Sequence, residues 1–127
     1  MTPTLKKLRY KSGMRVAVVD APSGFEVELS KSKGLTRRKG LSGPFELVQA
    51  FYTRRAHFER DAGRLREALA PRGILWVCYP KAKGLGTDLN RDILRESGAE
   101  RGLDAVAQVA IDAVWSALRF KTAPKGE

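Results

Sequence analysis

The sequence predicts a single α/β domain built on a mixed, mainly parallel β-sheet with helices packed on it. Apolar runs of strand length alternate with a segment of helical periodicity, which is the pattern of strands joined by crossover helices. The chain has 127 residues, of which 43% are hydrophobic, and this is enough for one core but short for two. We therefore expect residues 1–127 to form one domain.

The first strand is predicted from Met14 to Asp20, where the β-branched run MRVAVVD ends at a Pro-Ser-Gly turn. Residues 1–10 precede it as a basic lead-in that includes a short helical stretch. The segment Phe25–Leu29, FEVEL, follows it and alternates apolar with acidic residues, which predicts a half-exposed strand. Residues 30–44 are rich in glycine and basic residues without apolar periodicity, so we expect a mobile surface loop.

Phe45–Tyr52 and Gly73–Tyr79 are predicted as the second and third core strands. Between them, Arg54–Leu69 carries apolar residues at helical spacing, with Thr53 as its expected N-cap. A further helix is expected to begin near Asp88 and to fray at Gly98. Strands and helices in this order favour parallel pairing with right-handed connections.

The segment 103–121 fits two structures. Alanines and an apolar stripe at helical spacing favour a helix, whereas alternation on both sides of Asp112-Ala113 fits a two-stranded hairpin. Periodicity alone prefers the helix. Residues 122–127 are expected to form a flexible tail.

The order of these runs resembles a shortened class I S-adenosylmethionine-dependent methyltransferase, a Rossmann-like fold. More closely, the chain resembles a family of short bacterial proteins that is known only as a domain of unknown function. The residues that carry this likeness are Gly13–Val16, Ala21–Phe25, Ile74–Lys81 and Trp115–Phe120. The resemblance implies a methyltransferase-like sheet that ends in an antiparallel hairpin, so we expect 103–121 to form that hairpin.

Methyltransferases of this class hold their cofactor with an acidic residue and several glycines after the first strand, and with a second acid after the next strand. Here the first loop offers only Asp20 and Gly24, and no clear second acid follows. The resemblance therefore implies the scaffold with a degenerate cofactor loop, and we expect no cofactor. Fold does not imply activity, so an atypical methyltransferase stays an alternative.

Two segments are candidates for binding anions. The first is the turn after the third predicted strand, where a helix N-terminus and glycines favour a phosphate, through Lys81, Lys83, Gly84, Gly86 and Thr87. An ordinary loop in which Asp88 caps the next helix explains the same residues. The second is the basic loop, whose polyanion contacts would be Lys31, Lys33, Arg37, Arg38 and Lys39. A solvated surface loop is its alternative.

The sequence offers no catalytic residue and no metal site. His57 is the only histidine and lies among charged residues, and Cys78, the only cysteine, lies inside an apolar run. The lone cysteine excludes an intramolecular disulfide, and with no segment of membrane-spanning length we expect a cytoplasmic protein.

The charge of the chain indicates its class of partner. A formal net charge of +10 favours an anionic partner, either a nucleic acid or a phosphate-bearing ligand. We expect a non-catalytic binding or accessory domain, with an atypical methyltransferase, a sequence-nonspecific nucleic-acid-binding protein and a purely structural, self-associating protein as alternatives.

Overall fold

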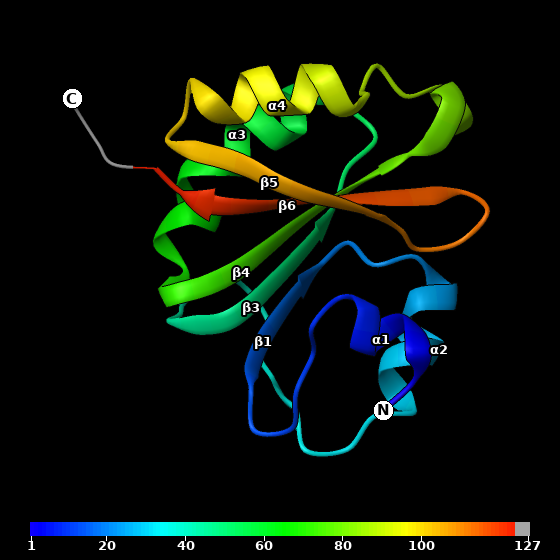
Figure 1. Cartoon of the computed structure of the whole chain (residues 1–127), viewed down its shortest axis with the longest axis vertical. Helices are drawn as coiled ribbons and strands as arrows, with labels where there is room; N and C mark the ends of the chain where they lie inside the picture. Colours follow the sequence, from blue (N-terminus) through cyan, green and yellow to red (C-terminus); the bar gives the residue numbers. More distant parts are fainter. Residues whose placement is uncertain (124–127) are drawn as a thin grey trace.

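A computed structural model describes residues 1–123 and shows a six-stranded sheet with helices on both faces (Figure 1). The strands occur in the order β2-β1-β3-β4-β6-β5. Their bounds are Arg15–Val19 for β1, Thr36–Arg37 for β2, Phe45–Phe51 for β3, Leu69–Pro80 for β4, Leu103–Ala110 for β5 and Trp115–Thr122 for β6. The α-helices are α1 (Pro3–Lys7), α2 (Ser23–Ser30), α3 (Arg55–Glu67) and α4 (Arg91–Ala99), and a 3₁₀ segment, η1, spans Lys81–Gly86.

Strands β2, β1, β3 and β4 run parallel, and β6 lies antiparallel between β4 and β5. The predicted α/β class, the parallel core strands and the C-terminal hairpin are therefore confirmed. The hairpin forms because Trp115–Phe120 supplies a run of mostly buried residues that pairs with the buried half of β4. Helical periodicity in 103–121 loses to this pairing, which buries most of Trp115–Phe120 against β4.

Two apolar clusters pack on opposite faces of the sheet. One lies under α3 and α4 and includes Phe58, Leu65, Leu94 and Phe120, all fully or nearly fully buried. The other lies under α1 and α2, and Trp76 belongs to it. The described residues contain no helix that is long and apolar enough to cross a membrane.

The predicted strand Phe25–Leu29 is wrong, because these residues belong to helix α2. Phe25 and Leu29, one helical turn apart, are buried, whereas Val27 is 54% exposed. A connection between the parallel strands β1 and β2 has to cross over the sheet, and a helix is the usual way to do so. Topology therefore overrides the alternating pattern.

The helix boundaries also differ from those predicted. Helix α3 ends at Glu67 and β4 starts at Leu69, so Pro71 and Gly73 lie in the strand rather than after the helix. A bulge accommodates them, because the β3–β4 register shifts between Phe45 and Leu47.

Thr53 does not cap α3; Arg54 holds that position and makes no side-chain cap. Instead, Asp88 reaches across from a later loop, and its Oδ1 accepts a hydrogen bond of 2.7 Å from Arg55 N. Helix α4 begins at Arg91 rather than near Asp88, with Asn90 as its N-cap. Asp88, which the sequence suggests as the cap of α4, thus caps α3 instead. Spacing along the chain does not reveal such a long-range cap.

The predicted lead-in contains α1, whose Leu5 is fully buried. The predicted loop 30–44 contains strand β2, which pairs with β1, and the expected mobility of this loop stays a prediction. Thr122 belongs to β6, and Ala123 N donates to Gly102 O. Residues 124–127 lie outside the described residues, so the flexible tail also stays a prediction.

Candidate functional site

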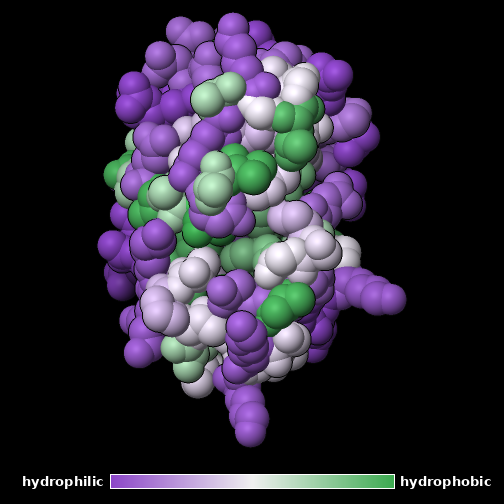
Figure 2. Space-filling model, turned by 90° about the vertical axis from the view of Figure 1, so that its right-hand side faces the viewer, coloured by the Kyte–Doolittle hydropathy of each residue, from purple (hydrophilic) through white to green (hydrophobic). Residues whose placement is uncertain are grey.

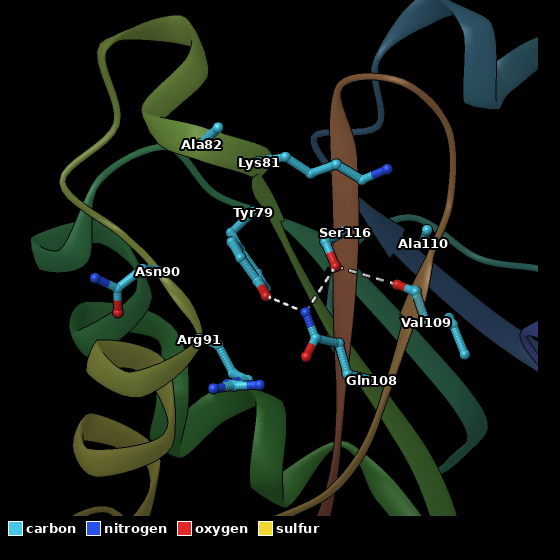
Figure 3. Close-up of a pocket in the computed structure, with 9 residues that line it drawn as sticks. All are labelled: Tyr79, Lys81, Ala82, Asn90, Arg91, Gln108, Val109, Ala110 and Ser116. Carbon is cyan, nitrogen blue, oxygen red and sulfur yellow. Dashed lines mark hydrogen bonds between the residues drawn. The ribbon is translucent and has the colours of Figure 1, made fainter.

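The carboxyl end of β4 and the β5–β6 hairpin border a depression of about 480 Å³, which we call the carboxyl-end depression (Figure 3). Open α/β sheets bind ligands beyond the carboxyl ends of their strands. Figure 2 views this side of the molecule, where apolar residues interrupt an otherwise hydrophilic surface. The depression is lined by Tyr79, Lys81, Ala82, Asn90, Arg91, Gln108, Val109, Ala110 and Ser116.

Tyr79, Gln108 and Ser116 form a hydrogen-bonded group on one wall (Figure 3). Gln108 Nε2 donates to Tyr79 Oη at 2.7 Å and to Ser116 Oγ at 3.2 Å. Ser116 Oγ in turn donates to Val109 O at 3.2 Å. Within residues 1–123, the Tyr79 hydroxyl proton and Gln108 Oε1 have no partner. The wall therefore offers one free donor and one free acceptor to a ligand.

Two cationic side chains complete the depression from other elements. Lys81 leaves the end of β4 and extends over the β5–β6 turn, where its Nζ donates to Asp112 O (Figure 3). Arg91 is the first residue of α4 and is half-exposed, with Asp92 Oδ1 at 3.5 Å from its Nε. No acidic residue lines the depression in the described part of the chain. Its charge therefore suits an anion.

Of the five residues predicted to bind an anion in this turn, only Lys81 lines the depression. Lys83, Gly84 and Gly86 lie in η1, where Lys83 is exposed. Thr87 Oγ1 donates to Thr53 O at 2.6 Å and accepts from Leu89 N at 3.0 Å. The Thr87 hydroxyl thus joins two loops, and an anion-binding role for the other four residues stays a prediction.

Sequence reasoning missed Arg91, Gln108 and Ser116 as lining residues. Gln108 and Ser116 are polar residues inside largely apolar strands. That contrast is the one feature of the sequence that could have indicated a role in a site. Their convergence depends on β6 lying between β4 and β5. Asn90 also lines the depression, but its Oδ1 already accepts from Ile93 N at 2.8 Å to cap α4.

The end of β1 does not form a glycine-rich loop. Asp20 follows the strand, is exposed and has a left-handed φ of 55°. Gly24 lies in α2, where an added Cβ would meet no atom within 4 Å. The space beside this glycine is therefore open. The expectation of a degenerate cofactor loop stays a prediction that this geometry supports.

The basic loop contributes to a second depression, of about 380 Å³, that is lined by Val18, Glu26, Arg37, Arg38 and Lys39. Arg37 forms a two-pronged ion pair with Glu26, at 2.7 and 2.6 Å. This pair holds the pKa of Glu26 below its usual range.

Arg38 and Lys39 are exposed, and Lys31 and Lys33 are exposed outside this depression. Arg38 and Lys39 directly follow β2. At this place the resemblance to methyltransferases implies an acidic residue that contacts the ribose. A polyanion contact by this loop stays a prediction.

A third polar group, at the end of β3, is already satisfied. The Tyr52 hydroxyl donates to Asp61 Oδ2 at 2.8 Å, and Arg60 Nε donates to Asp61 Oδ1 at 2.9 Å. Burial raises the pKa of Tyr52, and the Asp61 contact raises it further. These bonds tie β3 to α3, so we assign them a structural role.

His57 and Cys78 are the remaining residues that the sequence singled out. His57 is exposed on the first turn of α3, and Cys78 is fully buried. Burial raises the pKa of the Cys78 thiol, which leaves it protonated and unreactive at neutral pH. Within residues 1–123 no group of three or more His, Cys, Asp or Glu side chains is placed to hold a metal ion.

Solved structures with the same arrangement of strands and helices are S-adenosylmethionine-dependent methyltransferases and related proteins. The ribosomal protein L11 methylase of Lactobacillus delbrueckii subsp. bulgaricus matches with a TM-score of 0.61, 12% identity, and coverage of 95% of this chain and 75% of that chain. The complex of DhpI with SAH matches with a TM-score of 0.63, 13% identity, and coverage of 96% and 83%. The chain has a methyltransferase-like fold.

A TehB-like SAM-dependent methyltransferase from Corynebacterium glutamicum matches with a TM-score of 0.56 and 12% identity, over 93% of this chain and 85% of that chain. At such identities the methyltransferase-like fold is shown and the activity is not. No family model and no curated protein matches the sequence.

Proposed function

We propose that this chain is a non-catalytic binding or accessory module that recognises an anionic partner at the carboxyl-end depression. The observation that carries the proposal is the lining of the depression, to which Lys81, Arg91 and the free Tyr79 hydroxyl proton all contribute and which contains no acid among the described residues. Cationic groups and a neutral donor together suit a carboxylate or a phosphate. The proposal includes membership of the family of short bacterial proteins and a cytoplasmic location, which the lone buried Cys78 supports.

The geometry after β1 and β2 favours binding over methyl transfer. Asp20 is followed by Ala21 and Pro22 rather than glycines, and Arg38 and Lys39 stand where an acid would contact ribose hydroxyls. A carboxylate can accept hydrogen bonds from both ribose hydroxyls, whereas Arg and Lys side chains can only donate. That contact is therefore lost here. An active site also needs placed groups rather than topology alone.

The proposal is tested by titrating ¹⁵N-labelled protein with malonate and, separately, with inorganic phosphate. We expect saturable shifts of the Gln108 side-chain amide, because it borders the depression and bonds to Tyr79. Arg91→Gln should weaken binding by about tenfold, since a charge-assisted hydrogen bond is lost. Arg95→Gln, one turn further along α4 and outside the lining, is the matched control and should bind as the parent does.

Two results would count against the proposal: the absence of any shift at Gln108, or binding that Arg91→Gln and Tyr79→Phe leave unchanged. Tyr79→Phe removes only the hydroxyl, which separates the role of that donor from the packing of its ring.

An atypical S-adenosylmethionine-dependent methyltransferase is the second candidate, and the likeness to the DhpI complex with SAH favours it. Calorimetric titration with S-adenosylmethionine distinguishes the two functions. We expect no saturable heat, whereas micromolar binding that Asp20→Asn weakens would favour the methyltransferase instead.

Binding of a nucleic acid by the basic loop is the third candidate function, and the net charge of +10 supports it. Affinity for a single-stranded oligonucleotide should fall with salt with a log-log slope of about 0.7 per phosphate contacted. Substituting Arg38 and Lys39 with glutamine should reduce that slope if the basic loop makes the contacts. A slope that these substitutions leave unchanged would remove the loop from the interface.

A further inference from the structure

A separate basic pocket lies at the other end of the sheet, beside the beginning of β4 and the end of β6. It is a depression of about 530 Å³ whose cationic side chains are Arg9, Arg72, Arg119 and Lys121. We call this depression the basic pocket and these residues its four cations. The rest of its lining is Gly73, Ile74, Val106 and Phe120. It shares no residue with the carboxyl-end depression.

The basic pocket also opens on the other face of the sheet. Ala117, two residues before Arg119 on β6, packs in the cluster under α1 and α2, so alternation along the strand places Arg119 on that face. Tyr79 belongs to the cluster under α3 and α4. A ligand in one depression therefore does not touch the residues of the other.

Arg119 lines the pocket and has a buried side-chain donor without a hydrogen-bond partner among the described residues. It pairs with Trp76 of β4 and Ala107 of β5, in the interior of the sheet. Its Nε is buried and has no hydrogen-bond partner among residues 1–123. Burial lowers the pKa of Arg119, and the positive charge of Arg9 lowers it further. A buried N–H without a partner is costly, which is why such groups usually mark a missing ligand or water.

Arg9 and Arg72 both occupy backbone positions that suit glycine. Arg9 has a φ of 67° and directly follows the C-cap of α1, where its N–H donates to Lys6 O and that of Tyr10 donates to Leu5 O. These two bonds form a Schellman motif, whose corresponding residue is most often glycine.

Arg72 has a φ of 61° and lies in the β4 bulge. Next to it, Gly73 cannot carry a side chain, because a Cβ there would lie 2.8 Å from Ala70 O. Arg72 thus lies in the bulge with a backbone conformation that glycine would adopt with less strain. Left-handed residues other than glycine occur often at ligand-binding sites, and two of the four cations of this pocket have that conformation.

The four cations also lack counter-ions. Among the described residues none of them forms an ion pair. The nearest acid in the strand register is Asp104, which lies opposite Lys121 and makes no ion pair with it. Four positive groups around one depression repel each other, and a bound anion would relieve that repulsion.

We infer that the basic pocket is a binding site for a phosphate group, carried by a small phosphorylated molecule or by a nucleic-acid backbone. Guanidinium groups match phosphate oxygens with paired N–H donors, and Arg9, Arg72 and Arg119 bring three such groups to the lining of one depression. The inference goes beyond the proposed function, since the site uses other residues on another face.

The experiment is a titration with inorganic pyrophosphate, followed by calorimetry and by the Arg119 Nε–H signal in ¹⁵N spectra. Binding should move that signal, and Arg119→Gln should lower the affinity by at least about tenfold. Arg91→Gln, in the carboxyl-end depression, should leave the pyrophosphate-induced shift of the Arg119 Nε–H signal unchanged. Failure here and failure of the proposed function are therefore distinguishable.

Arg9→Gly and Arg72→Gly test the same site independently, in case Arg119→Gln does not fold. Each should lower pyrophosphate affinity while the thermal midpoint stays level or rises, because glycine relaxes a left-handed φ. Leu85→Gly, at a φ of 55°, controls for the backbone change without charge. Arg95→Gln controls for the charge change without the backbone.

Competition with a short oligothymidylate distinguishes the two phosphate sources. Displacement of pyrophosphate at lower oligonucleotide concentration assigns the site to a nucleic-acid backbone, and failure to displace it assigns the site to a small phosphorylated molecule. Pyrophosphate binding that survives Arg119→Gln and both glycine substitutions would overturn the inference, as would a loss of stability in the glycine variants.

Discussion

Gln49 lies on β3 between two other buried groups, at zero solvent exposure. Its Oε1 accepts a hydrogen bond of 2.7 Å from the Tyr10 hydroxyl, and its Nε2 donates to Cys78 Sγ at 3.4 Å. Burial raises the pKa of Tyr10, so the phenol is a neutral donor at neutral pH. The bond ties the segment after α1 to the centre of the sheet.

Gln49→Leu should destabilise the protein by about 1–3 kcal/mol, because the buried Tyr10 hydroxyl loses its acceptor. The double variant Gln49→Leu, Tyr10→Phe should cost less than the sum of the single substitutions, since no orphaned hydroxyl remains. Urea unfolding of the four proteins measures this. Additive costs would mean that the Tyr10–Gln49 bond contributes nothing to stability.

Asp61 gives stability a dependence on acid pH. The hydrogen bonds from Arg60, and then that from Tyr52, hold the pKa of Asp61 below its usual range, against the opposing effect of burial. A depressed folded pKa contributes stability that is present above the unfolded value of about 3.9 and is lost as pH falls through the folded pKa.

Asp61→Asn should be less stable than the parent by about 1–2 kcal/mol at neutral pH and should lose less stability below about pH 4. Thermal midpoints across the acid range provide the comparison. Asp92→Asn, at an exposed residue of α4, should follow the parent curve. An Asp61→Asn curve as steep as that of the parent would assign the acid loss to other carboxylates.

At the scale of the elements, two helical glycines with opposite surroundings test how tightly each helix packs. Gly63 lies in α3, where an added Cβ meets nothing within 4 Å. Gly98 lies in α4, where the same atom would lie 2.5 Å from Cε1 of the buried Phe120 ring. Helix α4 therefore approaches β6 more closely than a side chain allows.

Gly63→Ala should stabilise the protein by about 0.5–1 kcal/mol through helix propensity and reduced freedom of the unfolded chain. Gly98→Ala should destabilise it by about 1–3 kcal/mol, because Phe120 has to move against Phe58. Denaturant unfolding of the matched pair measures both. Equal effects would mean that Phe120 relaxes freely and that the close contact is unimportant.

At the scale of the whole molecule, the net charge of +10 sets the response to salt. Like charges repel in the folded state, and raising the salt from about 20 to about 300 mM shortens the reach of that repulsion. The exposed ion pairs, such as Arg37–Glu26, weaken at the same time but contribute little each.

We therefore expect the thermal midpoint to rise with sodium chloride. Lys31→Glu with Lys33→Glu lowers the net charge and should reduce that rise. Scanning calorimetry at both salt levels compares the two proteins. A midpoint that falls with salt would show that the surface ion pairs outweigh the net repulsion.

The parts of the fold that sequence predicted well are those determined by local pattern. The runs in Met14–Asp20, Phe45–Tyr52 and Gly73–Tyr79 are short and mostly apolar, which is typical of strands buried in a parallel sheet. The pattern misled in Phe25–Leu29, where alternation over five residues fits a strand, although Phe25 and Leu29 are also one helical turn apart. Short segments of this kind carry too little periodicity to decide.

The site was less predictable than the fold. Lys81 could be placed at the end of a strand, because the position of a turn after a buried run is a local property. Arg91, Gln108 and Ser116 could not be grouped with it, since they come from a helix and two strands that follow later in the chain.

By itself the sequence determined the α/β class, the three central strands and the basic character of the surface, because composition and short-range periodicity carry that information. Only the tertiary structure decided that β6 lies between β4 and β5, that Asp88 caps α3, and that Arg9 lines the same depression as Arg72 and Arg119. These contacts join residues far apart in the chain, and they form because burying the apolar strands together outweighs the cost of closing the loops between them.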